Sequence, residues 1–115
     1  MSRVLKNDKY RKSRGGQARL LDIHCVGCNS KVLIYQKDGK GFLHRIYLNR
    51  IFWPEEFELL QRKIFQSIKE IPNLQCDDCG EVIGTPMRHI DGRYAFRLRY
   101  GYFFKEIHQD GKIKV

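Results

Sequence analysis

The stretch 24-HCVGC-28 places two cysteines three positions apart directly after an apolar run, and 75-QCDDC-79 repeats that spacing. Two residues between paired cysteines let the chain turn back, so that both sulfurs reach one ion while backbone amides point toward them. Two such pairs supply the four tetrahedral ligands of a structural zinc site. The predicted ligands of one structural Zn²⁺ ion are Cys25, Cys28, Cys76 and Cys79.

The length and the apolar pattern of the chain limit the kind of protein it encodes. A chain of 115 residues has the size of one ordinary domain. No apolar run approaches the roughly 20 residues that a membrane span needs, and the amino-terminal 16 residues, MSRVLKNDKYRKSRGG, contain no apolar stretch typical of a signal peptide. We therefore expect a cytoplasmic protein without a membrane partner, in which a reducing environment favours metal binding over disulfides.

Three other uses of the cysteines fit the sequence less well. Redox chemistry of the thioredoxin type requires the Cys-x-x-Cys motif at the start of a helix in a βαβ unit, and neither pair has that setting. Iron remains an alternative to zinc, because tetrahedral sulfur coordination suits both metals, and it would give a rubredoxin-like electron carrier. A catalytic zinc is disfavoured because four thiolates leave no position for water or substrate. No nucleophile triad or phosphate-binding loop is present either, so we expect neither an enzyme nor a small-molecule substrate.

The segments CVGCNSKVLI and CDDCGEVIG carry a family resemblance. They resemble the zinc-ribbon class of small metal-binding domains, in which two Cys-x-x-Cys knuckles each lie at the tip of a β-hairpin. The resemblance covers at most residues 20–90, and it implies zinc-ribbon-like hairpins with the four cysteines as ligands. The chain departs from a plain ribbon by a helix inserted between the knuckles and by strands after the second one. A treble-clef arrangement is disfavoured because strand-like residues, EVIGT, follow the second pair.

Turn signals predict that most of the chain is antiparallel β-structure. ARLLDIH and KVLIYQK read as strands, and Asp38-Gly39 predicts a hairpin that joins the second of them to KGFLHRIYL. Asp91-Gly92 and Asp110-Gly111 predict two more hairpins. RYAFRLRYGYFF reads as one long strand with aromatic residues on one face and arginines on the other.

A helical period interrupts the strands. Apolar residues recur at steps of three or four from Phe57 to Ile71, which is the spacing of one helical face. Pro54 suits a first helical turn, and Pro72 ends the pattern. The predicted fold class is therefore mainly antiparallel β with one inserted amphipathic helix (α+β), the helix spanning about 54–71.

Charge is concentrated at the two ends of the chain. Residues 1–19 hold seven Lys or Arg and one acid, residues 20–83 hold eight and nine, and residues 84–115 hold seven and three, for a net charge of +9. The first segment lacks apolar periodicity and contains Gly15-Gly16. We therefore predict a basic flexible arm over 1–19 and a zinc-ribbon-like domain over 20–115.

The basic residues predict a nucleic-acid partner or a ribonucleoprotein. Cations in the arm would neutralise phosphates, and arginines on the carboxyl-terminal strand would extend the track beside rings able to stack on unpaired bases, which favours RNA or single strands. The predicted nucleic-acid-binding residues are Arg3, Lys6, Lys9, Arg11, Lys12, Arg14, Arg19, Arg93, Arg97 and Arg99.

The alternative prediction is a protein-interaction adaptor or a small homo-oligomer with a structural zinc. In this hypothesis a protein partner or a second copy of the chain binds to the amphipathic helix or to the apolar residues around Ile51, Phe52 and Trp53. The basic arm is then a solvated tail, and the aromatic face is part of the core.

Overall fold

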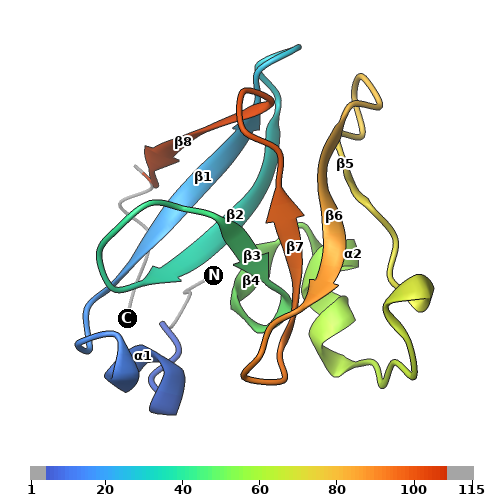
Figure 1. The fold of residues 1–115 in the computed structure, drawn as a ribbon. Coiled ribbons are helices and arrows are strands. Elements are labelled where there is room, and N and C mark those ends of the chain that lie inside the picture. Colours follow the sequence, from blue (N-terminus) through green and yellow to red (C-terminus); the bar gives the residue numbers. More distant parts are fainter. Residues whose placement is uncertain (1–4, 109–115) are drawn as a thin grey trace.

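The computed structural model describes residues 5–108, which form two four-stranded antiparallel sheets with short helical segments between the strands (Figure 1). The first sheet has the order β4-β2-β1-β8, with β1 at Ala18–Cys25, β2 at Lys31–Asp38, β4 at Ile51–Trp53 and β8 at Phe103–Ile107. The second sheet has the order β3-β7-β6-β5, with β3 at Arg45–Tyr47, β5 at Leu74–Gln75, β6 at Val82–Arg88 and β7 at Tyr94–Leu98. The mainly antiparallel β architecture is confirmed.

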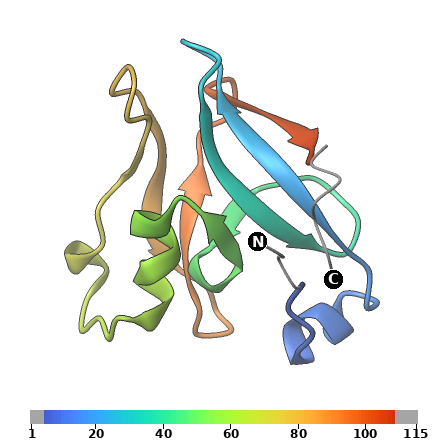
Figure 2. The same ribbon diagram turned by 180° about the vertical axis from the view of Figure 1, so that it is seen from behind.

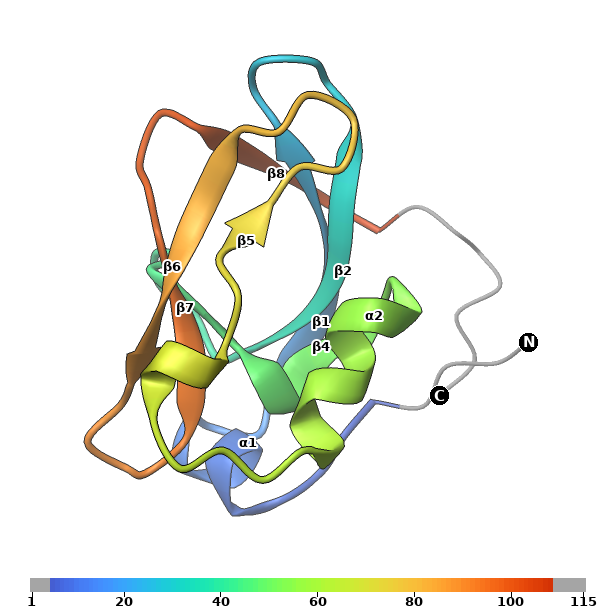
Figure 3. The ribbon, with the colours of Figure 1, turned by 90° about the vertical axis from the view of Figure 1, so that its right-hand side faces the viewer.

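The core lies between the two sheets, which face each other in the side view (Figure 3). Leu21 and Ile23 on β1 stand opposite Tyr35 and Leu33 on β2, and all four side chains are buried. The second sheet contributes a matching inner face, on which Phe96 and its register partner Ile46 are fully buried. Branched and aromatic residues on facing strands therefore exclude water from the space between the sheets.

Several predicted strands occur where the sequence placed them. ARLLDIH lies in β1 and KVLIYQK lies in β2. The predicted turn at Asp91-Gly92 joins β6 to β7, and Gly92 has a positive φ of 94°. That hairpin is confirmed. The hairpin predicted at Asp110-Gly111 lies outside the described residues.

The hairpin predicted at Asp38-Gly39 is wrong. Gly39 does adopt a positive φ of 76°, but β2 pairs with β1 and β4, whereas the next strand, β3, pairs with β7 in the other sheet. Contacts from other parts of the chain explain the difference. The Asp38 carboxylate accepts a hydrogen bond from Arg50, and the Gly39 amide donates to the carbonyl of Gln17 at 2.8 Å. These contacts hold the turn against the amino-terminal segment.

The long strand predicted over residues 93–104 is divided in two. Gly101 has a φ of 85°, and the chain turns there, so that β7 ends at Leu98 and β8 joins the first sheet beside β1. Tyr94, Phe96 and Leu98 point into or toward the core as the alternation predicts. Tyr100, which the alternation places on the same face, is exposed.

The continuous helix predicted over 54–71 is wrong. The structure has a short α-helix, α2 at Glu55–Glu58, followed by two separate 3₁₀ segments, η2 at Leu59–Arg62 and η3 at Ile68–Glu70. A third, η1, spans Leu48–Arg50. Among residues 5–108, no helix is long and apolar enough to cross a bilayer.

Local hydrogen bonds replace helical ones over residues 66–70. The Ser67 hydroxyl accepts a hydrogen bond from the Lys69 amide, and the Glu70 carboxylate accepts one from the Gln66 amide. Such side-chain partners compete with helical backbone bonds. Phe65, which is outside the predicted apolar face, packs edge-on against Tyr94. Ile64, which belongs to the predicted face, is 93% exposed.

The described part of the predicted flexible arm is folded against the body of the protein. Helix α1 spans Lys9–Ser13 at the end of the first sheet where β1 begins (Figure 2). Asp8 caps this helix by accepting hydrogen bonds from the amides of Tyr10 and Arg11. The same carboxylate accepts two hydrogen bonds from the fully buried guanidinium of Arg50, at 2.6 and 3.1 Å. Charge composition alone does not reveal this buried partner.

Candidate metal centre and basic surface

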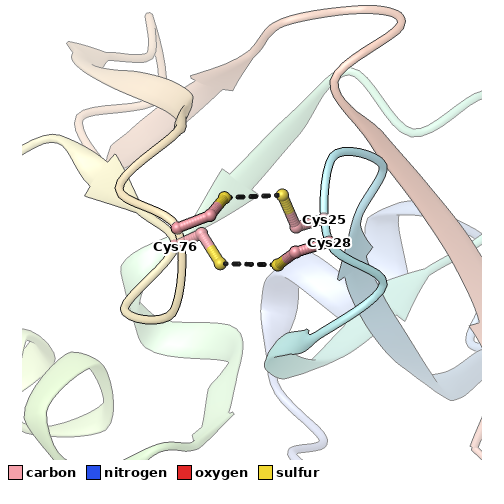
Figure 4. Close-up of side chains that lie close together, drawn as sticks. Cys25, Cys28 and Cys76 are labelled. Atoms are coloured by element: carbon pink, nitrogen blue, oxygen red, sulfur yellow. Dashed lines mark hydrogen bonds between the residues drawn. The ribbon is translucent and has the colours of Figure 1, made fainter.

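The four cysteines converge from two turns that are distant in sequence. Cys25 is the last residue of β1 and Cys28 lies in the turn that leads to β2, whereas Cys76 and Cys79 lie in the turn between β5 and β6. Figure 4 shows side chains of the two turns pointing toward one another. The Sγ–Sγ distance is 3.6 Å between Cys25 and Cys79 and 3.5 Å between Cys28 and Cys76, and all four sulfurs lie within 4.8 Å of one another.

These distances fit one tetrahedral metal ion. Metal–sulfur bonds of about 2.3 Å place tetrahedral sulfurs about 3.8 Å apart. A disulfide bond is only about 2.0 Å long, and all four cysteines are free. The chain therefore carries a cluster of four cysteines that is close enough to bind one metal ion.

Each of the two turns has the same pattern of backbone hydrogen bonds, which explains why both orient their sulfurs alike. In the first turn the Cys25 amide donates to the carbonyl of Ser30, and its carbonyl accepts from the Asn29 amide. In the second turn Cys76 makes the equivalent bonds with Glu81 and Gly80. The position after each second cysteine is left-handed, with φ 65° at Asn29 and 80° at Gly80. Glycine reaches this region without strain, and asparagine tolerates it better than most residues.

The stability of the protein should therefore depend on how readily the residue at position 29 adopts the left-handed conformation. Its side chain is exposed, so removal of the side chain itself should have little effect. We expect Asn29→Gly to leave the free energy of unfolding within a few tenths of a kcal/mol of the original, and Asn29→Ala to lower it by about 1 kcal/mol, because alanine is strained in the left-handed region. Urea denaturation of the metal-loaded proteins measures both values. Equal stability of the two variants would contradict this explanation of the turn.

A polar contact also joins the two turns. The Ser30 hydroxyl donates a hydrogen bond to the Asp78 carboxylate. The sequence did not link Ser30 with Asp78, because the bond crosses 48 residues of sequence. Ser30 also hydrogen-bonds to the Cys28 thiol and lowers its pKa to about 7.

Two other thiols have raised pKa values. Burial raises the pKa of Cys76. The Glu81 amide acts to lower the pKa of Cys79, but the Cys25 thiol and burial outweigh it and raise that pKa to about 12. Metal ligands must be thiolates, so metal binding has to displace these protons and strengthens as the pH rises.

The predicted nucleic-acid-binding residues are only partly available at the surface. Arg3 lies outside the described residues. The Lys6 backbone exchanges two hydrogen bonds with the buried side chain of Gln36, and Arg11 donates to the carbonyl of Gly16 at 2.7 Å. These contacts fix the two cations in the folded structure. The exposed members of the predicted set are Lys9, Lys12, Arg14, Arg19 and Arg97.

Arg93 and Arg99 also have partners within the fold. The Arg93 guanidinium lies between the rings of Tyr10 and Tyr47, at 3.7 and 3.6 Å from their centroids, and pairs with Asp91. Arg99 lies 3.7 Å from the Tyr102 ring and donates to a backbone carbonyl on β6. Sequence alternation placed these arginines on one face but did not show that aromatic rings cover two of them.

The surface predicted for a protein partner is divided between the core and the solvent. Ile51 is buried in β4, and Phe57 and Leu60 of the predicted helical face belong to the core. The exposed members are Trp53, Ile64 and Ile68. The adaptor hypothesis stays a prediction.

Comparisons of the chain with models of known protein families, with curated proteins and with solved structures found no match.

Proposed function

We propose that the chain is a non-enzymatic nucleic-acid-binding protein whose fold is fastened by one structural zinc ion in a zinc-ribbon-like arrangement. Cys25, Cys28, Cys76 and Cys79 would hold the ion, which supplies folding free energy by joining the two sheets. Four thiolates complete the coordination of zinc and leave no position for a substrate, which supports a structural role for the metal. Iron at the same ligands is the alternative, and visible absorbance of the purified protein distinguishes the two metals.

The observation that carries the nucleic-acid proposal is a group of exposed rings beside two arginines. Arg45 on β3 and Arg97 on β7 are register partners on the outer face of the second sheet, and neither forms an ion pair with a carboxylate of residues 5–108. At the end of this strand pair the ring of His44 contacts the rings of Phe42 and Tyr100 edge to face.

This arrangement suits an unpaired strand better than a duplex. Phe42 is 84% exposed, so its ring is free to stack on a base. Stacking of bases on aromatic side chains, together with cations that follow the backbone, is the usual mode of single-strand binding. The chemistry at this surface therefore favours RNA or single-stranded DNA as the partner.

Substitution of Phe42 tests this proposal. Loss of one stacking ring costs about 1–3 kcal/mol, so Phe42→Ala should weaken binding of a single-stranded oligonucleotide by roughly 5-fold to 150-fold. Fluorescence anisotropy with a labelled RNA of about 12 nucleotides measures the affinity, and repetition at several salt concentrations measures the electrostatic part.

Ile90→Ala is the matched control, because Ile90 is 99% exposed at the tip of the β6–β7 hairpin and its replacement also removes an exposed apolar side chain. The control should bind as the original protein does. Deletion of the first 19 residues is not a suitable test, because it would remove Asp8 from the buried Arg50 and destabilise the fold. Failure of the original protein to bind any single strand in a salt-dependent manner would overturn the proposal.

A further inference from the structure

A basic groove lies at the end of the first sheet, away from the metal centre. It has a volume of about 280 Å³ and is bounded by the start of β1, the loop at 39–41 and strand β8. Its cationic lining residues are Arg19, Lys37, Lys40 and Lys105. Only Arg19 belongs to the basic residues that the sequence singled out.

Strand register brings these cations together. Arg19 on β1 stands directly opposite Lys37 on β2. Lys105 lies on β8, which pairs with the other edge of β1, and Lys40 belongs to the loop that follows β2. The cations are therefore fixed by three neighbouring strands and one anchored loop. A groove on paired strands is more rigid than a mobile basic tail.

The positive charge of the groove is not neutralised within the described chain. None of its four cations forms an ion pair with a carboxylate of residues 5–108. Among residues 5–108, Glu106 is the one acidic side chain that lines the groove, and its carboxylate lies 3.0 Å from Nε2 of His24. An anion entering the groove therefore meets a surplus of positive charge.

Repulsion among the cations of the groove is clearest at Lys37. It is only 9% exposed, and its ammonium donates to the carbonyl of Gly39 at 3.1 Å. Burial lowers its pKa, and repulsion from Arg14, Lys105 and Arg19 lowers it further. A bound anion would relieve that repulsion, because opposite charge nearby favours the charged form of an amine.

We propose that this groove is a binding site for phosphate groups, in which Arg19, Lys37, Lys40 and Lys105 supply the charge-assisted hydrogen bonds. Guanidinium and ammonium groups both bind phosphate oxygens strongly. The groove also continues toward the exposed rings: Lys37 lines a neighbouring cavity of about 150 Å³ together with Phe42 and Arg45. If the groove contacts the phosphates of a bound nucleic-acid strand, this inference rests on the proposed function. A free phosphate compound presents the same chemistry to the groove.

The test compares two double variants that have the same net charge. Lys40→Gln with Lys105→Gln removes two exposed cations of the groove. Lys63→Gln with Lys69→Gln removes two exposed lysines from the segment that follows η2, on the other side of the molecule (Figure 1). Affinity for a labelled single-stranded RNA is measured against salt concentration. Pyrophosphate is then titrated into each protein while its backbone amide resonances are recorded.

The groove variant is expected to bind the RNA roughly tenfold more weakly at moderate salt. The slope of log K against log salt should fall by about 1.4, because each phosphate that a lysine no longer neutralises reduces it by about 0.7. The control variant should match the original protein in slope. If both double variants bind the RNA equally and pyrophosphate does not shift the amides of Gly39 and Gly41, the groove is not a phosphate site, although the proposed function stands.

The pyrophosphate titration separates the groove from the proposed function. If the original protein binds no RNA but pyrophosphate shifts the amides of Gly39 and Gly41, and does not shift them in the groove variant, then the groove stands as a site for a free phosphate compound and the nucleic-acid proposal fails. If neither RNA nor pyrophosphate affects these amides, the groove proposal is overturned.

Discussion

Replacement of Cys76 with serine is expected to abolish metal binding and to leave the protein unfolded at neutral pH. Cys76 is buried, and its sulfur is one of the four that meet between the two sheets. Structural zinc sites contribute about 10–16 kcal/mol of binding free energy in small domains, which is comparable to or larger than the stability of a whole domain. Loss of one thiolate ligand should therefore remove most of the free energy of folding. Circular dichroism and metal analysis of the purified variant measure both effects.

Val26→Ser is the matched control for this experiment. It introduces a serine into the same turn as Cys25 and Cys28, at an exposed position, and leaves all four cysteines in place. We expect it to bind metal and to melt close to the original temperature. A strong chelator should unfold the original protein, and added zinc should restore it. A Cys76→Ser protein that keeps its metal and its melting temperature would remove the structural role of the cysteines.

Replacement of Arg50 with methionine is expected to lower the free energy of unfolding by about 3–5 kcal/mol, because removal of one partner from a buried ion pair leaves a charge without compensation. The Arg50 side chain is fully buried and contacts Asp8 and Asp38, and the Asp38 side chain is itself only 8% exposed. Methionine fills much of the volume but offers no donor to either carboxylate. Urea denaturation at saturating zinc measures this loss separately from metal binding.

Arg62→Met supplies the comparison for Arg50→Met. Arg62 pairs with Glu58 one helical turn away, and its side chain is mostly exposed, so its removal should change the stability by less than about 0.5 kcal/mol. Trypsin should also cleave the amino-terminal segment faster in Arg50→Met than in Arg62→Met. If the Arg50 variant is as stable as the Arg62 variant, the buried network does not anchor this segment.

The contact between Arg50 and Asp8 should also affect how the stability of the protein changes at low pH. The hydrogen bonds from Arg50 lower the pKa of Asp8 to about 2, from an ordinary value of 3.8. A carboxyl whose pKa is lowered by folding stabilises the protein fully above its unfolded value, and this contribution is lost as the pH falls from near 4 through about 2. Arg50→Met should therefore show a weaker loss of stability over that pH range than the original protein.

The cysteine cluster was predictable because its information is local. Two residues between the cysteines fix the turn, and four thiols in two pairs leave few other arrangements. The left-handed position after the second pair is filled by a glycine, Gly80, whereas the equivalent position in the first turn is filled by Asn29. Asparagine is a weaker signal than glycine because it is common in many other turns.

The structure of the elements that the sequence did not predict correctly depends on contacts between distant residues. A regular apolar spacing from Phe57 to Ile71 predicts a helix, but tertiary packing selected Phe65 rather than Ile64 for burial. The basic composition of residues 1–19 predicts mobility, but one acid, Asp8, meets Arg50 across 42 residues of sequence. Arg50, which lies between Asn49 and Ile51, gives no sign in the sequence of its buried partners, so the sequence did not reveal how the described part of this segment is held.

The most direct test of the account is the metal content of the folded protein. Elemental analysis of protein purified without added metal, combined with native mass spectrometry, gives the identity and the number of bound ions per chain. The account predicts one zinc ion per chain and four thiols that react only after the ion is removed. A folded protein with no bound metal and four freely reactive thiols would contradict it.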